Sequence, residues 1–163
     1  MDMENVFEKL LLQTSFACMA CDGEIAHEEV ATIKSFAEEK KVFGNLDIET
    51  ELQMLTEEIN KKGKVFLKQY LLMVADSSLS IEQECAVLQI ALDTIKSDND
   101  VRYSEVKFFK VLRSNLKNIT DTEILKRVDG IDESYLAQDI KQSYIEMYDS
   151  YFDNIELSEV VIN

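Results

Sequence analysis

The chain has 163 residues, of which 46% are hydrophobic, with four glycines and no proline. This length fits a single domain with a sizeable core, and the scarcity of proline and glycine favours helices joined by short turns. Lys and Arg number 17 against 32 Asp and Glu, and the resulting net charge of −15 disfavours nucleic-acid binding because it repels phosphate backbones.

The sequence also indicates a location. No apolar run approaches the roughly 18 residues of a membrane span, and the acidic N-terminus Met1–Glu4 lacks the basic head of a signal peptide. Three cysteines are an odd number, which argues against a disulfide framework. We therefore expect a cytoplasmic protein that reaches a membrane only through a partner.

The first half of the chain shows three helical patterns. A stripe with a 3.6-residue period predicts a helix over 4–21 and contains Phe7, Leu10, Leu11, Thr14, Ala17, Cys18 and Cys21. A second helix is predicted from about residue 26 to Phe43, with Gly44 as its left-handed cap. A third amphipathic helix over 48–62 is predicted to end at Lys61-Lys62-Gly63, where cations and glycine suit a helix C-terminus.

The second half continues in the same way. Residues 65–75 are apolar nearly all round, which predicts a helix buried on most sides. Capping boxes at Ser80 with Gln83 and at Thr120 with Glu123 open helices over 81–95 and 121–128. Residues 104–117 form another predicted helix, with Phe108, Phe109, Leu112 and Leu116 facing inward.

The last predicted helix, over 132–155, carries a stripe of Leu136, Ile140, Tyr144, Met147 and Tyr151. We expect an all-α protein with seven to eight helices in one compact domain over 1–155. Residues 156–163 are expected to form a flexible tail.

The most informative feature is a near-repeat. The unit Asp22–Val30 (DGEIAHEEV) recurs 76 positions later as Asp98–Val106 (DNDVRYSEV). Each copy has two acids at a turn, then an aliphatic residue, then a Glu in the first turn of the next helix. Each copy also separates two apolar helical patterns, so the sequence predicts an internally duplicated helix-turn-helix.

Two interpretations of these acidic corners stay open. In the first, the acids only stabilise helix N-termini, where the helix dipole favours negative charge. In the second, they bind a divalent cation, because carboxylate oxygens suit Ca²⁺ or Mg²⁺. The ligands would be drawn from Asp22, Glu24, Glu29, Asp98, Asp100 and Glu105.

Neither corner is an EF-hand. The positions for the first two carboxylates of that loop hold Cys18 and Ala20 in one copy and Thr94 and Lys96 in the other. A metal site would therefore need another construction, such as the two corners brought together.

The segment from Phe16 through Asp22-Gly23-Glu24-Ile25 to Glu28-Glu29-Val30 resembles the TerB-like domain family, and the second unit fits that family's internal repeat. The resemblance covers residues 5–117. It implies an all-helical, cytoplasmic, non-enzymatic bacterial module linked to resistance to tellurite and chemical stress. It also implies metal chelation by Asp22, Glu24, Glu29, Asp98, Asp100 and Glu105. The chain departs from the family at the helix starts, which have Ala26-His27 and Arg102-Tyr103 where Ser, Thr or Asp followed by Pro is common.

Cysteine and histidine offer little chemistry. Cys18 and Cys21 could form a redox or zinc half-site, but both lie on an apolar stripe without a second pair of metal spacing, which favours core cysteines. His27 is the only histidine and has no nucleophile beside it in the pattern. We therefore expect no enzymatic activity, and a metal-dependent enzyme is the least favoured hypothesis.

An alternative function is a metal-independent scaffold for protein partners. One side of the predicted helix over 102–117 is basic, with Arg102, Lys107, Lys110, Arg113 and Lys117. Residues 129–163 carry nine acids and one Lys141. A solvated face is the simpler interpretation of each, but a polarised molecule would dock an acidic partner on the basic helix and a basic partner on the acidic C-terminal helix. The sequence does not decide the oligomeric state.

Overall fold

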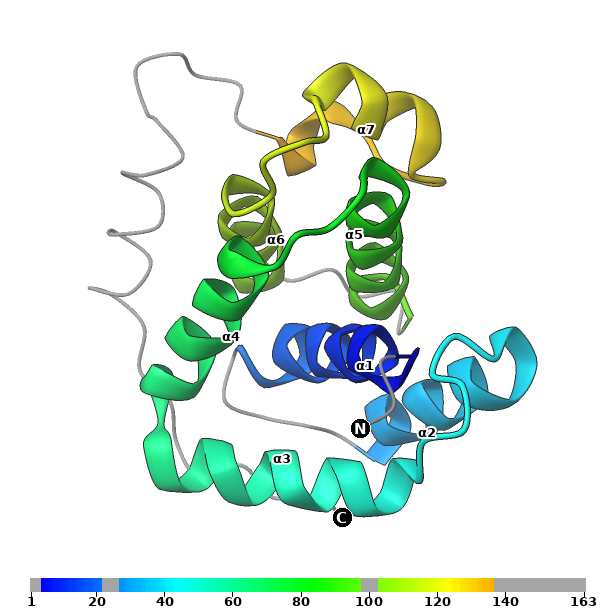
Figure 1. Ribbon diagram of the computed structural model, residues 1–163, viewed down its shortest axis with the longest axis vertical. Helices are drawn as coiled ribbons and strands as arrows, with labels where there is room; N and C mark the ends of the chain where they lie inside the picture. Colours follow the sequence, from blue (N-terminus) through cyan, green and yellow to red (C-terminus); the bar gives the residue numbers. More distant parts are fainter. Residues whose placement is uncertain (1–3, 22–26, 98–102, 137–163) are drawn as a thin grey trace.

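The computed structural model describes residues 4–21, 27–97 and 103–136. Within these ranges the chain forms a compact bundle of seven α-helices and no strand, as expected (Figure 1). The elements are α1 (Glu4–Ala20), α2 (His27–Ser35), a π-helical turn η1 (Phe36–Lys40), α3 (Ile48–Lys62), α4 (Lys64–Asp76), α5 (Ile81–Ile95), α6 (Tyr103–Ser114), α7 (Asp121–Arg127) and a 3₁₀ turn η2 (Glu133–Tyr135).

Local signals set many of the helix ends. The Ser80 side chain accepts a hydrogen bond from Gln83 N–H, and the Gln83 side chain accepts one from Ser80 N–H, which completes the predicted capping box of α5. Thr120 likewise caps α7 by accepting from Glu123 N–H. Gly63 ends α3 with φ of 60°, a conformation that glycine adopts without strain.

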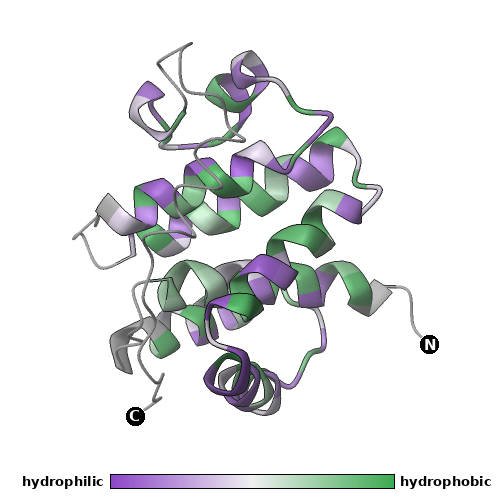
Figure 2. Ribbon diagram, turned by 90° about the vertical axis from the view of Figure 1, so that its left-hand side faces the viewer, coloured by the Kyte–Doolittle hydropathy of each residue, from purple (hydrophilic) through white to green (hydrophobic). Residues whose placement is uncertain are grey.

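Helix α1 lies at the centre of the bundle and packs against α2, α3, α4, α5 and α6. Figure 1 shows α1 surrounded by these neighbours, and Figure 2 shows hydrophobic positions gathered along helix sides that face one another. From Thr14 to Cys21 every residue of this segment is buried. The α1 segment is therefore buried all round, whereas its sequence predicts only one core-facing stripe. Burial is tolerable because the polar side chains of Thr14 and Ser15 both form hydrogen bonds.

Helix α4, in contrast, is less buried than its sequence predicts. Its predicted burial on most sides is wrong, because Val65, Leu72 and Met73 are 47%, 55% and 40% exposed. Its other side packs into the core through Phe66, Leu67, Tyr70, Leu71 and Val74. Phe66 meets Phe16 of α1 edge to face, and Tyr70 stacks on Phe108 of α6. Helix α4 thus has apolar side chains that the described residues do not cover.

The second helix also ends earlier than predicted. The helical path stops after Lys40, and Lys41 takes the left-handed conformation with φ of 53°. Gly44 has positive φ as well, but it belongs to the turn that follows. There a Cβ atom on Gly44 would lie 3.2 Å from the Glu8 Cγ atom of α1, so glycine permits a close approach of this turn to α1.

The predicted helix over 132–155 does not begin at residue 132. Asp132 caps the single turn η2, and Leu136 is buried in an extended conformation. The preceding chain is held against α5, because Gln89 exchanges two hydrogen bonds with the backbone of Asp129. Residues 137–155 of that prediction, and the predicted tail over 156–163, lie outside the described residues.

Candidate functional site

The two acidic corners join equivalent helix pairs. The first corner connects α1, which ends at Ala20, to α2, which begins at His27. The second connects α5, which ends at Ile95, to α6, which begins at Tyr103. The starts of α2 and α6 are 76 positions apart (103 − 27), the same offset that separates the two sequence units.

Helices α1 and α5 pack against each other close to their C-terminal ends. The Ser15 and Thr94 hydroxyls form a buried hydrogen bond of 2.8 Å across this contact. Thr94 is one residue before the end of α5, and Ser15 is five residues before the end of α1. At a rise of 1.5 Å per residue, both helix ends lie within roughly 8 Å of this hydrogen bond along their axes.

The remaining contacts between the pairs are reciprocal. Helix α1 of the first pair contacts α6 of the second, and α5 of the second pair contacts α2 of the first. If α1 is exchanged with α5 and α2 with α6, the α1–α6 contact becomes the α5–α2 contact, and the α1–α5 contact stays the same. The two helix pairs therefore interlock around the α1–α5 contact (Figure 1).

Glu105, the last acid of the second corner, lies in the first turn of α6 and is only 8% exposed. Burial raises the pKa of the Cys18 thiol, and the nearby Glu105 carboxylate raises that pKa further. Burial, followed by the charges of Asp132 and Glu105, also raises the pKa of Tyr135. The Glu105 carboxylate thus acts on the last turn of α1, from which the first acidic corner departs.

The other predicted metal ligands are not placed. Glu29 belongs to α2, but its side chain, like that of His27, lies outside the description. Asp22, Glu24, Asp98 and Asp100 lie outside the described residues altogether. Among the described residues, no group of three or more His, Cys, Asp and Glu side chains is arranged to hold a metal ion. Glu105 is therefore the one predicted ligand whose side chain the description includes.

The positions of the three cysteines are those of structural residues. Cys18 of α1 and Cys21, which directly follows α1, are buried, Cys85 of α5 is half-buried, and none of the three forms a disulfide. Cys21 donates to the Cys18 carbonyl oxygen at 3.2 Å, a contact within the same helical turn. The pair therefore belongs to the core, as the apolar stripe predicts.

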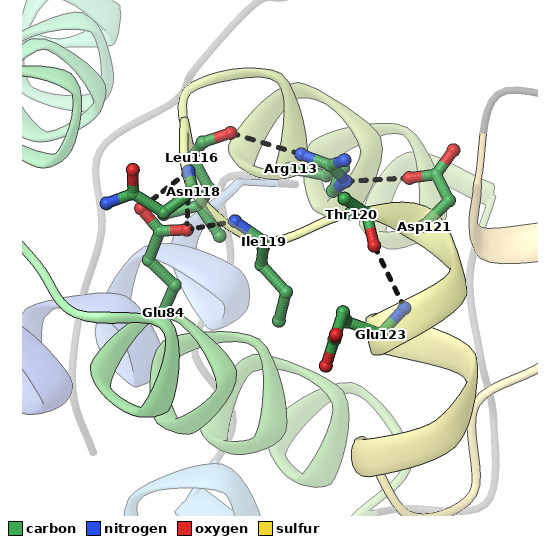
Figure 3. Close-up of polar contacts among 8 residues, drawn as sticks. All are labelled: Glu84, Arg113, Leu116, Asn118, Ile119, Thr120, Asp121 and Glu123. Atoms are coloured by element: carbon green, nitrogen blue, oxygen red, sulfur yellow. Dashed lines mark hydrogen bonds and ion pairs between the residues drawn. The ribbon is translucent and has the colours of Figure 1, made fainter.

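The basic residues predicted to form one surface of α6 differ in their exposure. Lys107 and Lys117 are exposed, Lys110 is half-buried, and Arg102 lies outside the described residues. The Arg113 side chain is only 11% exposed, and it binds Asp121 Oδ1 at 2.8 Å and the Leu116 carbonyl oxygen at 3.1 Å (Figure 3). Arg113 thus ties the end of α6 to the start of α7, whereas Lys107 and Lys117 face solvent.

Glu84 is a structural residue that sequence reasoning missed. It is 3% exposed, and its carboxylate accepts hydrogen bonds from the N–H groups of Asn118 and Ile119, the latter at 2.7 Å (Figure 3). The Lys117 N–H group donates to the same carboxylate. The signal was present in the sequence, since Glu84 lies four residues before Leu88 on the apolar stripe of α5. An acid on an apolar helix face indicates a buried carboxylate that needs donors.

A polar hollow of about 460 Å³ lies beside this carboxylate, between the α4–α5 connection and the residues that follow α6. Its lining includes Glu84, Lys117 and Asn118 together with the serines of the connection. Because three backbone amides already engage the Glu84 carboxylate, this carboxylate binds the 117–119 loop instead of a ligand.

Comparison with models of protein families, with curated proteins and with solved structures finds no match for this chain. Among the described helices, none is long and apolar enough to cross a membrane.

Proposed function

We propose that this protein is a non-enzymatic TerB-like module in which the two acidic corners together hold a divalent cation. The module would act as an adaptor or sensor in the cytoplasmic response of bacteria to tellurite and chemical stress. The observation that carries the proposal is the α1–α5 contact. It brings together the ends of the two helices from which the corners depart.

An internal duplication explains this arrangement. The two sequence units, the starts of α2 and α6, and the reciprocal contacts between the helix pairs all follow one relation between residues 4–35 and 81–114. Such a relation would place the acids of the two corners in equivalent positions on either side of the α1–α5 contact. One composite site is then the simplest way for both corners to supply ligands.

The chemistry of the corners favours Ca²⁺ or Mg²⁺. Six carboxylates offer hard oxygen ligands, and neither corner has enough of them in EF-hand spacing to bind alone. Glu105 supports the shared site, since its buried carboxylate acts on Cys18 at the end of the opposite helix pair. A cation would neutralise the mutual repulsion of these acids.

Cation binding would alter the whole bundle because α1 is its central helix. A bound ion would stiffen the connections that leave α1 and α5, and α1 contacts five other helices. The surface offered to protein partners would then depend on cation concentration, which is the behaviour of a sensor.

Calorimetric titration of chelator-stripped protein with Ca²⁺ and with Mg²⁺ tests the proposal. We expect saturable binding of at least one ion that is weakened tenfold or more by Asp22→Asn and by Asp98→Asn, with the helical circular dichroism unchanged. Asp76→Asn, at the exposed end of α4, is the matched control and should bind like the wild type. Absence of binding, or unchanged affinity in both corner variants, would refute the metal site.

A metal-independent scaffold is the second candidate, and the exposure of Lys107 and Lys117 favours it. This basic surface, with the half-buried Lys110, would bind an acidic protein partner. The interaction should weaken as salt screens the charges and should ignore chelators. A pull-down in rising salt, with and without chelator, separates it from the cation-dependent adaptor, whose partner binding should respond to the chelator.

A further inference from the structure

The outer side of α4 is an apolar surface that the described residues leave uncovered. Val65 and Leu72 are seven positions apart, two helical turns, and Met73 follows directly. Their exposed fractions, 47%, 55% and 40%, are large for apolar side chains on one helix side. Gln69, which is also exposed, lies between Val65 and the Leu72–Met73 pair on this side. Large exposed apolar side chains grouped on one helix side indicate a binding surface. We call Val65, Leu72 and Met73 the α4 surface.

The α4 surface is flanked by positive charge. Lys61, Lys62, Lys64 and Lys68 lie at the α3–α4 junction and on the first turns of α4, and residues 61–75 contain no acid. Lys62 Nζ donates to Gln69 Oε1 at 3.0 Å, which holds this lysine along α4. The chain has a net charge of −15, and one other stretch of this length, residues 106–120, also holds no acid and four basic residues. The nearest acid on α4 is Asp76 at its C-terminal end. The surface therefore fits an occupant that is both apolar and acidic.

The chain itself contains such a segment. Residues 137–163 follow the last described residue and carry six acids against the single Lys141. Ile140, Tyr144, Met147 and Tyr151 recur at intervals of four, three and four, the spacing of one helix side. As a helix, residues 137–155 would be about 28 Å long, enough to lie along the roughly 20 Å of α4.

The described chain ends within reach of α4. The Tyr135 ring contacts Phe109 of α6, with ring centroids 5.4 Å apart. The adjacent Phe108 stacks on Tyr70 of α4 at 6.4 Å. The widths of α6 and of α4 itself, each about 10 Å, therefore separate the end of the described chain from the outer side of α4. A segment tethered at this distance has a high effective concentration at the α4 surface.

A second copy of the chain is a poorer occupant. A symmetric contact between two α4 surfaces would bring the same four lysines together, and each copy also carries a net charge of −15. We therefore propose that residues 137–155 of the same chain dock as an amphipathic segment on the α4 surface, with their acids facing Lys61–Lys68.

Zero-length carbodiimide crosslinking of the full chain tests this docking. Equal amounts of protein with natural isotopes and with ¹⁵N are mixed before the reaction, and crosslinked peptides are identified by mass spectrometry. We expect amide bonds between lysines at 61–68 and acids at 139–153, and only between peptides of the same isotope. Crosslinks that join the two isotopes would show that a second copy occupies the surface and would overturn the proposal.

Two variants test the apolar part of the contact. Leu72→Asp with Met73→Asp should reduce these crosslinks at least fivefold while circular dichroism shows a folded helical protein. Met54→Asp is the matched control, because Met54 of α3 is 51% exposed and lies outside the α4 surface. Wild-type protein without these crosslinks, or a double variant that retains them, would overturn the proposal. The crosslinking results do not depend on cation binding. The docking proposal and the proposed metal site can therefore be refuted independently of each other.

Discussion

The Ser15 and Thr94 hydroxyls form a buried 2.8 Å hydrogen bond that joins α1 to α5 near the ends of both helices. Thr94 also donates to the Ile90 carbonyl oxygen at 2.7 Å, so its own hydroxyl proton is used within α5. Ser15 is then the donor across the helix contact. The hydrogen bond lies within the α1–α5 packing contact, and this packing sets the spacing between the helix ends that bear the two acidic corners.

Substitutions at Ser15 should therefore affect stability and cation affinity differently. Ser15→Ala removes the hydrogen bond with little change of volume and should cost about 1 kcal/mol of unfolding free energy while leaving affinity unchanged. Ser15→Leu overpacks the contact, should cost about 1–3 kcal/mol and should weaken cation binding because the helix ends shift. Urea unfolding and calorimetric titration measure the two effects. Equal affinity in both variants would show that this spacing does not govern the site.

Glu84 should be a major contributor to stability although it belongs to no proposed binding site. Glu84→Gln replaces one acceptor oxygen with a donor that faces backbone N–H groups, and we expect a loss of about 2 kcal/mol. The neighbouring Glu82 is exposed, and Glu82→Gln should change stability by less than about 0.5 kcal/mol. Urea unfolding of both variants gives the comparison. Equal effects would contradict the role of the 117–119 amides.

The basic residues of α6 should separate into structural and surface groups. Arg113→Ala removes the ion pair to Asp121 and the hydrogen bond to Leu116, and should cost about 1–2 kcal/mol. Lys107→Ala and Lys117→Ala should leave the thermal midpoint nearly unchanged. In the scaffold hypothesis only the two lysine variants would weaken partner binding without a loss of stability. Thermal unfolding of the three variants checks the first part directly.

The buried phenol of Tyr70 should make the protein sensitive to alkali. Burial raises the pKa of Tyr70 above its ordinary value of 10.0, while the Thr14 hydrogen bond opposes this shift in part. A raised pKa in the folded state stabilises the protein below pH 10, and this contribution declines as the pH rises further. The slope should be up to about 1.4 kcal/mol per pH unit. Tyr70→Phe should show a shallower decline between pH 10 and 11 in urea unfolding, and equal slopes would contradict this origin.

Local patterns predicted the helices well because the relevant forces act over one or two turns. The capping residues Ser80 and Thr120 fix the starts of α5 and α7, and Gly63 fixes the boundary between α3 and α4. The end of the second helix was wrong because Lys41 adopts a left-handed conformation that glycine normally marks. The start at residue 132 was wrong because the Asp132 cap produces only one 3₁₀ turn.

Long-range contacts could not be predicted in this way. The burial of the C-terminal half of α1 on all sides and the exposure of one side of α4 depend on which helices surround each, and periodicity does not encode that. The same holds for the Ser15–Thr94 contact, which joins residues 79 positions apart. For the candidate site, the repeat predicted the starts of α2 and α6, but the electrostatic effect of Glu105 on the pKa of Cys18 depends on the packing of α6 against α1.

The stoichiometry of cation binding tests most directly whether the two corners form one site. Native mass spectrometry of chelator-stripped protein in saturating Ca²⁺ should show one ion per chain in the wild type. At a Ca²⁺ concentration near the wild-type Kd, both Asp22→Asn and Asp98→Asn should be almost entirely in the metal-free form, because each corner supplies part of the ligand set. Two ions in the wild type with one retained in each variant would mean separate sites, and no ion in the wild type would mean that the corners only stabilise helix ends.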